Sequence, residues 1–262
     1  MEKTEIISGI YAIGPALWIS RGKILIIGDV HLGYEDTLEK QGFILPRSQF
    51  KESVEIMKYV FKEVGKAELI VINGDLKHEF GRISDQEWLD TSRFLDLLSK
   101  NCKELLLIKG NHDTVLGPIA KKKNLEVKKY LTFKLNKGEE IEIKEKSFLR
   151  KKIRRIKAIT ILHGDKIIEE KSVKDSDLLV IGHDHPAVLL EEGVKKEKYK
   201  CFLFGNYKKQ KIIVMPSFLP GIEGVNVKQR ELLSPYLDQD LDDFEVFIVG
   251  DKIYKFGKLK NL

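Results

Sequence analysis

The sequence of 262 residues has few cysteines and histidines and no long hydrophobic run. Its apolar runs, such as residues 24–27 and 69–72, are far shorter than the roughly 20 residues of a membrane-spanning helix, so we expect no membrane span. The N-terminal stretch MEKTEIISGI has mixed charge and lacks the apolar segment of a secretory signal, which predicts a cytoplasmic protein. The two cysteines, Cys102 and Cys201, form no CxxC motif, which excludes a thiolate zinc motif and a disulfide framework.

The net charge of +6 is concentrated in two segments. Residues 144–157 hold eight Lys/Arg and one Glu, and residues 195–211 hold seven Lys and one Glu. Clusters of this kind are typical of nucleic-acid-binding surfaces, and they are equally compatible with the solvated face of a lysine-rich protein. The residues predicted to contact nucleic acid are Arg150, Lys151, Lys152, Arg154, Arg155, Lys208 and Lys209.

Six short apolar runs are each followed by a glycine or a polar cluster. Because these runs are continuous and not alternating, they predict strands buried on both faces of a sheet, as in an α/β fold. They are residues 24–27, 69–72, 105–108, 159–162, 178–181 and 212–215.

Two amphipathic helices are predicted between the first three of these runs. Residues 48–64 place Phe50, Val54, Met57, Phe61 and Val64 at helical spacing. Residues 84–100 begin with Ser and Glu in capping-box spacing, so the first half reads β-α-β-α-β. A hairpin is predicted around Gly250-Asp251. We expect one domain over residues 1–262, with a motif core at about 22–188 and a β-rich extension at about 189–262.

All six histidines lie within a few residues of the end of a predicted strand. In α/β sheets the carboxyl ends of strands are where ligands bind, so we expect these side chains and the acidic and amide groups near them to lie close together. Each polar cluster at a strand end is weak evidence for a metal ligand when taken alone. Five such clusters together predict a metal site, since a cation removes the cost of burying their polar groups. The residues are Asp29, His31, Asp75, His78, Asn111, His112, Asp113, His163, His183 and His185.

The types of these side chains indicate the metal. Carboxylate, imidazole and amide donors without thiolate favour hard or borderline divalent ions, with Mn²⁺ preferred and Fe²⁺, Zn²⁺ or Ni²⁺ as alternatives. Seven donors suit two ions about 3.5–4 Å apart that share a carboxylate and a hydroxide. The sequence therefore predicts a two-metal hydrolytic site.

The series GDVH, GDLKH, GNHD, HGD and GHDH resembles the calcineurin-like metallophosphoesterase superfamily. The resemblance implies a four-layer α-β-β-α sandwich with two packed mixed β-sheets. It also implies that Asp29, His31 and His185 hold one ion, that Asn111, His163 and His183 hold the second, and that Asp75 bridges both.

Such a site would hydrolyse a phosphodiester by in-line attack of the bridging hydroxide. His112 follows Asn111 directly, and we expect it to protonate the departing oxygen, with Asp113 orienting it.

The histidine at position 78, together with HLGYEDTLEKQGFILPRSQ, GHDHPAV and MPSFLPGIEG, resembles SbcD-related archaeal phosphoesterases and ligase-associated DNA endonucleases. In that branch the histidine equivalent to His78 helps to position the DNA backbone. The resemblance implies a Mn²⁺-dependent DNA nuclease in DNA repair, with a helicase or other repair protein as partner. The chain is too short for the DNA-capping domain of the large repair nucleases. The sequence does not distinguish exonuclease from endonuclease action, and it does not predict the oligomeric state.

Two other functions fit the same residues. The first is a phosphodiesterase or phosphomonoesterase of small molecules such as cyclic nucleotides. The second is a binding scaffold without turnover, which the complete set of expected ligands disfavours.

Overall fold

The computed structural model describes residues 2–44, 46–78, 84–113, 117–146, 151–193, 195–229 and 232–262. None of the helices in these ranges combines the length and apolar character that crossing a membrane requires. The α-helices are α1 (Tyr34–Lys40), α2 (Gln49–Val64), α3 (Asp85–Lys100), α4 (Gly117–Lys122) and α5 (Lys171–Lys174), and the short 3₁₀ turns are η2 (Val227–Gln229) and η3 (Leu259–Asn261).

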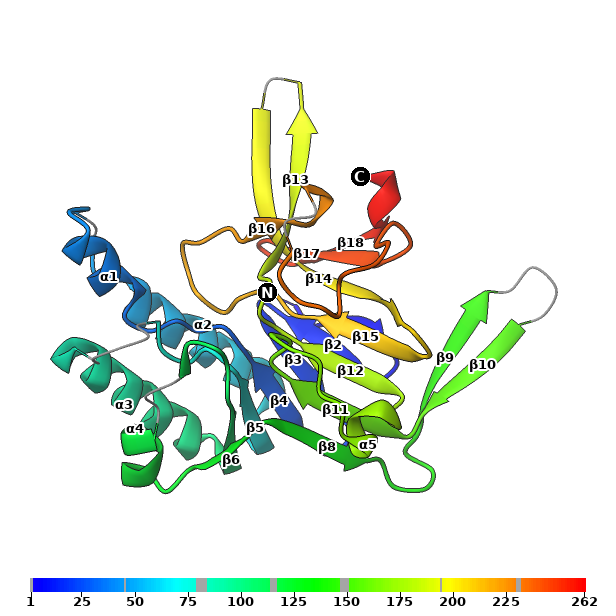
Figure 1. Cartoon of the computed structure of the whole chain (residues 1–262), viewed down its shortest axis with the longest axis horizontal. Helices are drawn as coiled ribbons and strands as arrows, with labels where there is room; N and C mark the ends of the chain where they lie inside the picture. Colours follow the sequence, from blue (N-terminus) through cyan, green and yellow to red (C-terminus); the bar gives the residue numbers. More distant parts are fainter. Residues whose placement is uncertain are drawn as a thin grey trace.

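Two large mixed sheets form the centre of the molecule (Figure 1). The first sheet contains β1 (Thr4–Ile7), β2 (Ile10–Ile13), β3 (Ala16–Ile19), β4 (Ile24–Ile27), β5 (Ala67–Asn73), β6 (Cys102–Ile108) and β7 (Glu126–Lys128), in that order. Strands β1 to β4 pair antiparallel, and β4 to β7 pair parallel. The N-terminal meander therefore extends a parallel β-α-β-α-β unit.

The second sheet contains β8 (Tyr130–Lys134), β11 (Ala158–Leu162), β12 (Leu178–Ile181), β13 (Pro186–Glu192), β14 (Lys195–Tyr207), β15 (Gln210–Val214), β16 (Val225–Asn226), β17 (Glu245–Val249) and β18 (Ile253–Lys258). Its order is β16-β13-β14-β15-β12-β11-β8, with β17 beside β14 and β18 beside β17. Strands β11, β12 and β15 are parallel. A separate hairpin of β9 (Ile141–Lys146) and β10 (Lys151–Ile156) projects from the side of the molecule opposite α1 and α3 (Figure 1).

Apolar side chains hold four layers together. Ile26 and Val71 of the first sheet and Ile159 and Phe202 of the second belong to the core between the sheets. Helices α2 and α3 cover the outer face of the first sheet. The outer face of the second sheet is covered by the short α5 and by the irregular segment 232–244. The predicted α-β-β-α sandwich is confirmed, and its fourth layer is thin.

The structure confirms all six strands predicted from continuous apolar runs, and β4, β11 and β12 are buried at every position. The hairpin around Gly250-Asp251 is also confirmed, as β17 and β18. The prediction of a single domain over 1–262 stays a prediction.

Helix α2 is present, but its buried stripe is rotated from the one predicted. Met57 is buried as expected, whereas Phe50 and Phe61 are only half-buried. Gln49 and Ser53 are buried instead. The polar Gln49 can be buried because its Nε2 donates to the carbonyls of Val30 and His31, at 3.3 and 2.7 Å.

We expect Ser84→Ala to lower the free energy of unfolding by about 1 kcal/mol. The Ser84 hydroxyl caps α3 by accepting the backbone N–H of Glu87 at 3.0 Å, and it also donates to Asp36 Oδ2 at 2.7 Å. Urea denaturation would measure the change. Ser84→Thr keeps the hydroxyl and serves as the control, so equal loss in both variants would contradict a capping role.

Candidate metal centre

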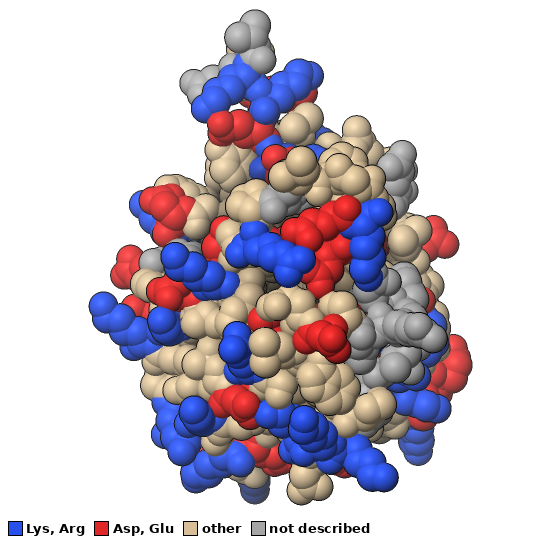
Figure 2. Space-filling model, turned by 90° about the vertical axis from the view of Figure 1, so that its left-hand side faces the viewer, with Lys and Arg blue, Asp and Glu red and all other residues tan. Residues whose placement is uncertain are grey.

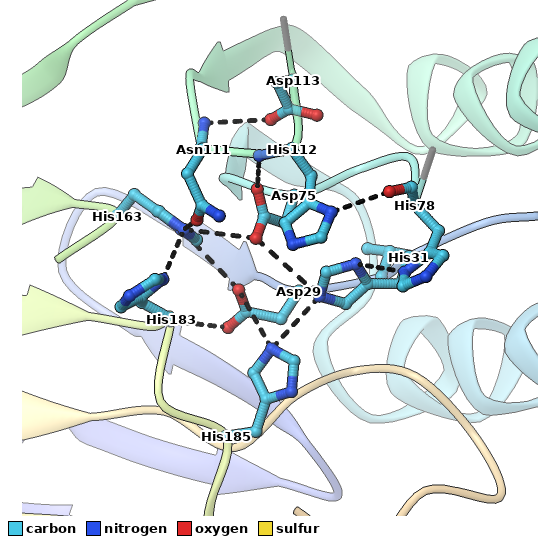
Figure 3. A network of polar contacts seen from close by, with 12 residues as sticks. Asp29, His31, Asp75, His78, Asn111, His112, Asp113, His163, His183 and His185 are labelled. Atoms are coloured by element: carbon cyan, nitrogen blue, oxygen red, sulfur yellow. Dashed lines mark hydrogen bonds and ion pairs between the residues drawn. The ribbon is translucent and has the colours of Figure 1, made fainter. Parts of the chain in front are cut away.

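The carboxyl ends of β4, β5 and β6 meet those of β11 and β12 at one rim between the sheets, which we call the metal rim (Figure 3). Within the first sheet, Asp29 N donates to Gly74 O at 3.0 Å, and within the second, Gly182 N donates to His163 O at 2.9 Å. The backbone N–H of His183 donates to Asp29 Oδ2 at 3.0 Å and so joins the two sheets. The loops after five strands are therefore held against one another.

The backbone of the metal rim is strained. Among the described residues, eight that are not glycine have positive φ, and five of them are expected metal ligands. Such conformations cost of order 1–3 kcal/mol each and persist only where the surroundings over-determine them. The five are Asp29, His31, Asp75, His183 and His185, with φ between 47° and 74°.

The first group of donors comes from both sheets. His31 Nε2 lies 3.2 Å from His185 Nε2, and His185 Nε2 lies 3.6 Å from Asp29 Oδ1. Asp75 Oδ2 lies 3.8 Å from His31 Nε2. These four side chains are the set expected for one ion.

The second group lies beside the first and shares a carboxylate with it. His163 Nε2 lies 2.9 Å from Asn111 Oδ1, 3.2 Å from His183 Nδ1 and 3.3 Å from Asp75 Oδ2. Asp75 Oδ2 thus lies within 3.8 Å of an imidazole nitrogen in each group, as expected of a bridging ligand.

The two carboxylates fit a pair of cations. Each uses one oxygen to accept a backbone N–H, since Asp29 Oδ2 accepts from His183 and Asp75 Oδ1 accepts from His112 at 2.8 Å. Asp29 Oδ1 is buried and has no hydrogen-bond partner among the described residues. A buried acceptor without a donor is costly, and a cation would satisfy it.

The pKa values point to a demand for positive charge. Burial by itself would raise the pKa of Asp29 and Asp75, but the hydrogen bonds and charges of neighbouring histidines outweigh it and lower both. Burial would lower the pKa of His163, yet the hydrogen bond and charges of these carboxylates raise it to about 9. Burial and the neighbouring His185 lower the pKa of His31 to about 3.

Two glycines of the motifs are explained by close approach. A Cβ at Gly110 would overlap Asp75 Oδ1, and a Cβ at Gly182 would lie 2.5 Å from Asp29 Oδ2. Both positions therefore require glycine while the carboxylates stay in place.

His112 and His78 lie next to the first donor group. The Nδ1 of His112 lies 2.7 Å from the carbonyl oxygen of His78, and His78 Nδ1 lies 3.3 Å from His31 Nδ1. The rings of His78 and His112 are stacked, with centroids 5.3 Å apart and an angle of 25°. Since a carbonyl only accepts, His112 carries its proton on Nδ1 and is oriented by the His78 backbone.

Asp113 does not orient His112, contrary to expectation. Its carboxylate accepts the backbone N–H of Leu76 at 3.1 Å and of Gly110 at 3.0 Å. Burial, together with the charge of Asp75, raises the pKa of Asp113 to about 6. Asp113 therefore braces the loops after β5 and β6 and does not face the reacting groups.

Two further residues, Gln49 and Asp184, position the expected ligands and were not predicted from the sequence. Gln49 holds the carbonyl of His31, as described above, and no local pattern marks it. Asp184, between two ligands in GHDH, is only 3% exposed and accepts the backbone N–H groups of Leu233 and Ser234 at 2.6 and 3.0 Å. Its place between two histidines was the one available signal.

Lys200 was predicted as part of a basic surface segment, but it is half-buried and turned toward the metal rim's support. Its Nζ donates to the carbonyls of Ser217, at 2.9 Å, and Leu219. Residues 217–219, the strap, pass under the metal rim, where Phe218 N donates to Gly28 O at 2.9 Å and Leu219 N donates to Asp29 O at 3.2 Å. Lys200 therefore fixes the segment that supports the strained backbone of Asp29.

Of the predicted nucleic-acid contacts, the described side chains of Arg154, Arg155, Lys208 and Lys209 lie at the end of the second sheet opposite the metal rim. Lys208 and Lys209 form the turn before β15, which runs parallel to β12 toward the rim. Arg154 donates to the carbonyl of Lys209, and Arg155 Nε donates to Glu142 at 3.1 Å. Arg150 and the side chains of Lys151 and Lys152 lie outside the described residues. Binding of nucleic acid there stays a prediction, and it would not hold the phosphate at the rim.

We expect Lys200→Met to weaken the binding of Mn²⁺ about tenfold, because loss of a residue that orients ligands typically has this effect. Calorimetric titration with Mn²⁺ would measure it. Lys198→Met is the matched control, since Lys198 lies two residues away on the same face of the strand. Its side chain is partly exposed, and its Nζ lies 3.8 Å from Glu223 Oε2. Equal Mn²⁺ affinity in both variants would contradict the role of Lys200.

A cleft of about 290 Å³ opens onto the metal rim. Its lining includes His31, Asp75, His78, Asn111, His112, His183 and His185.

The crystal structure of nuclease MPE from Pseudomonas putida is similar to this fold, with 14% identity over 97% of this chain and 99% of that chain and a TM-score of 0.59. At that identity the likeness concerns the fold alone.

Two other solved structures give TM-scores too low to support an argument. Vacuolar Protein Sorting 29 from Cryptosporidium parvum and a predicted phosphoesterase from Streptococcus pneumoniae are each 14% identical over 90% of this chain and 97% of theirs, with TM-scores of 0.37 and 0.33. Comparison with curated proteins gave no match.

The sequence pattern of the calcineurin-like phosphoesterases matches residues 22–222, which include both donor groups and the strap. Because the match spans well over half of the chain, the protein belongs to the calcineurin-like phosphoesterase family, whose members are metal-dependent hydrolases.

Proposed function

We propose that the protein is a two-metal phosphodiesterase that hydrolyses phosphodiester bonds in DNA. The observation that carries the proposal is the position of Asp75 Oδ2 between two groups of donors at the base of a cleft. In this proposal Asp29, His31 and His185 hold one ion, Asn111, His163 and His183 hold the other, and Asp75 bridges them.

The donor set suits Mn²⁺ or another borderline divalent ion, because it combines oxygen and imidazole nitrogen and contains no thiolate. Bound in pairs, such ions stabilise charge on a phosphoryl group and lower the pKa of water. The chain's own contribution is to hold seven donors in place through the strained loops, Gln49 and the strap.

His112 is the proposed general acid. Its Nδ1 proton is engaged by the His78 carbonyl, so Nε2 is the nitrogen that exchanges protons. In hydrolysis the oxygen of water adds to phosphorus and the P–O ester bond breaks. His112 acts as the acid when both of its ring nitrogens are protonated, and its Nε2 proton passes to the departing oxygen, which removes the charge on that oxygen. The attacking water loses a proton to solvent, and His112 is left neutral with its remaining proton on Nδ1 until solvent protonates Nε2 again. His78 keeps the His112 ring in place through the carbonyl contact and ring stacking.

DNA as the substrate rests on the resemblance of His78 and its neighbourhood to the SbcD-related branch. The similar Pseudomonas putida structure is of a nuclease, which is compatible with this proposal.

Charges of both signs are interspersed on the side of the molecule drawn in Figure 2, with lysines gathered on the β13–β14 hairpin at its top. A DNA-repair role, a cytoplasmic location and a helicase partner belong to the same proposal.

A small-molecule phosphodiester or phosphomonoester is the second candidate. The cleft of about 290 Å³ favours it, because that volume is at the lower end of the range for small-ligand sites. A nucleotide within a DNA strand would have to enter the same cleft.

We expect the wild-type protein to cut labelled single- or double-stranded DNA with Mn²⁺, and His112→Ala to reduce the rate about 10²–10⁴-fold through loss of the general acid. Gel electrophoresis of the fragments would measure the rate. Lys123→Ala on the distant α4 side, where Lys123 pairs with Asp96, is the control and should cut as wild type does. Intact DNA alongside rapid hydrolysis of a cyclic nucleotide or a mononucleotide would contradict the DNA substrate and favour the second candidate.

We further expect two Mn²⁺ per chain after dialysis, as measured by elemental analysis, and activity lost on chelation and restored by Mn²⁺. His185→Ala removes a ligand of one ion only and should retain one Mn²⁺, whereas Asp75→Ala removes the shared ligand and should retain none. His112→Ala is the control with two ions. Two ions in Asp75→Ala would show that this carboxylate does not bridge.

A further inference from the structure

One wall of the cleft is apolar. Beside the polar residues of the metal rim, the cleft is lined by Leu219, Ile222, Val225 and Leu233. Ile222 and Val225 are half-buried, and Leu233 is 78% exposed. A single exposed leucine is ordinary on a protein surface, but several apolar side chains on one wall of a cleft suggest a ligand with an apolar part.

This wall is fixed to the loops that carry the expected ligands. Leu219 N donates to Asp29 O at 3.2 Å, and Val225 N donates to His185 O at 2.9 Å. Leu233 N donates to the buried carboxylate of Asp184 at 2.6 Å.

Three of the four wall residues therefore donate a backbone hydrogen bond to Asp29, Asp184 or His185. The distance between the wall and the metal rim is set by these short hydrogen bonds. An apolar group that rests on the wall would be held at a constant position relative to a phosphate at the rim.

Leu233 is the most informative of the wall residues. Its backbone is held by a carboxylate that is only 3% exposed, yet most of its side chain is in water. Leu233 thus places an exposed apolar side chain at a fixed position on the wall of the cleft, where a ligand can contact it.

We propose that Leu233, Ile222 and Val225 form a subsite for the nucleobase of the nucleotide whose phosphate lies at the metal rim. The proposal rests on the proposed function and names which part of the substrate the cleft recognises. Charged groups are absent from these three side chains, so the subsite suits a flat, uncharged ring and not a second phosphate. Small aryl esters share this chemistry and are separated from nucleotides by the experiment.

The test measures the Mn²⁺-dependent hydrolysis of three esters that share p-nitrophenol as the leaving group. They are the p-nitrophenyl esters of thymidine 5′-phosphate, phenyl phosphate and methyl phosphate. We expect kcat/KM for the thymidine ester to exceed that for the methyl ester about tenfold, as is typical of a small apolar contact. Leu233→Ser should reduce this ratio to about one, while Leu233→Met should preserve it. Leu89→Ser on α3, where Leu89 is 41% exposed, is the matched control.

Equal kcat/KM for all three esters, or an equal effect of Leu233→Ser on each, would overturn the subsite. A preference for the phenyl ester over the thymidine ester would overturn the nucleobase as occupant. If no ester is hydrolysed, the proposed function fails, and binding to Mn²⁺-loaded protein decides the subsite separately. Phenylphosphonate should then bind more tightly than methylphosphonate in the wild type but not in Leu233→Ser, and equal binding would overturn the subsite.

Discussion

The arrangement of the whole metal rim depends on two buried carboxylates, Asp29 and Asp75. Each accepts a backbone N–H with one oxygen and turns the other toward imidazoles, so each both ties loops together and attracts positive charge. Two anions buried side by side are unfavourable unless donors and cations surround them. The histidines of both sheets supply that environment, and the strained backbone at the rim is what brings them close.

The segments around the rim are linked through hydrogen bonds that radiate from the ligand loops. Gln49 of α2 holds the His31 carbonyl, the strap holds Gly28 and Asp29, and Asp184 holds the segment that begins with Leu233. Elements far apart in sequence thereby share one rigid frame. The same frame that positions the donors also positions the cleft wall, so the two have a common structural basis.

Much of the fold could be predicted because burial on both faces leaves a direct trace in the sequence. The continuous apolar runs of β4, β11 and β12 are fully buried, and the capping residue Ser84 begins α3 as its spacing indicates. The stripe of α2 was predicted less well, because hydrophobic spacing cannot show that Gln49 is buried to satisfy carbonyl oxygens of another loop. Asp113 was assigned to the wrong partner for the same reason, since each of its oxygens accepts a backbone N–H from a neighbouring loop.

The sequence by itself determined the strands and the set of donors, because glycine-bounded apolar runs and the placement of all six histidines are local features. Only the tertiary structure decided which charged residues belong to the site. Lys200 and Lys209 come from one basic segment, but β14 carries them to different ends of the sheet, so one supports Asp29 through the strap and the other lies far from it. The apolar wall was likewise invisible in the sequence, because its residues are brought to the rim by hydrogen bonds to residues up to 190 positions away, as between Leu219 and Asp29. Such partners are set by chain direction and packing in space, which no local pattern encodes.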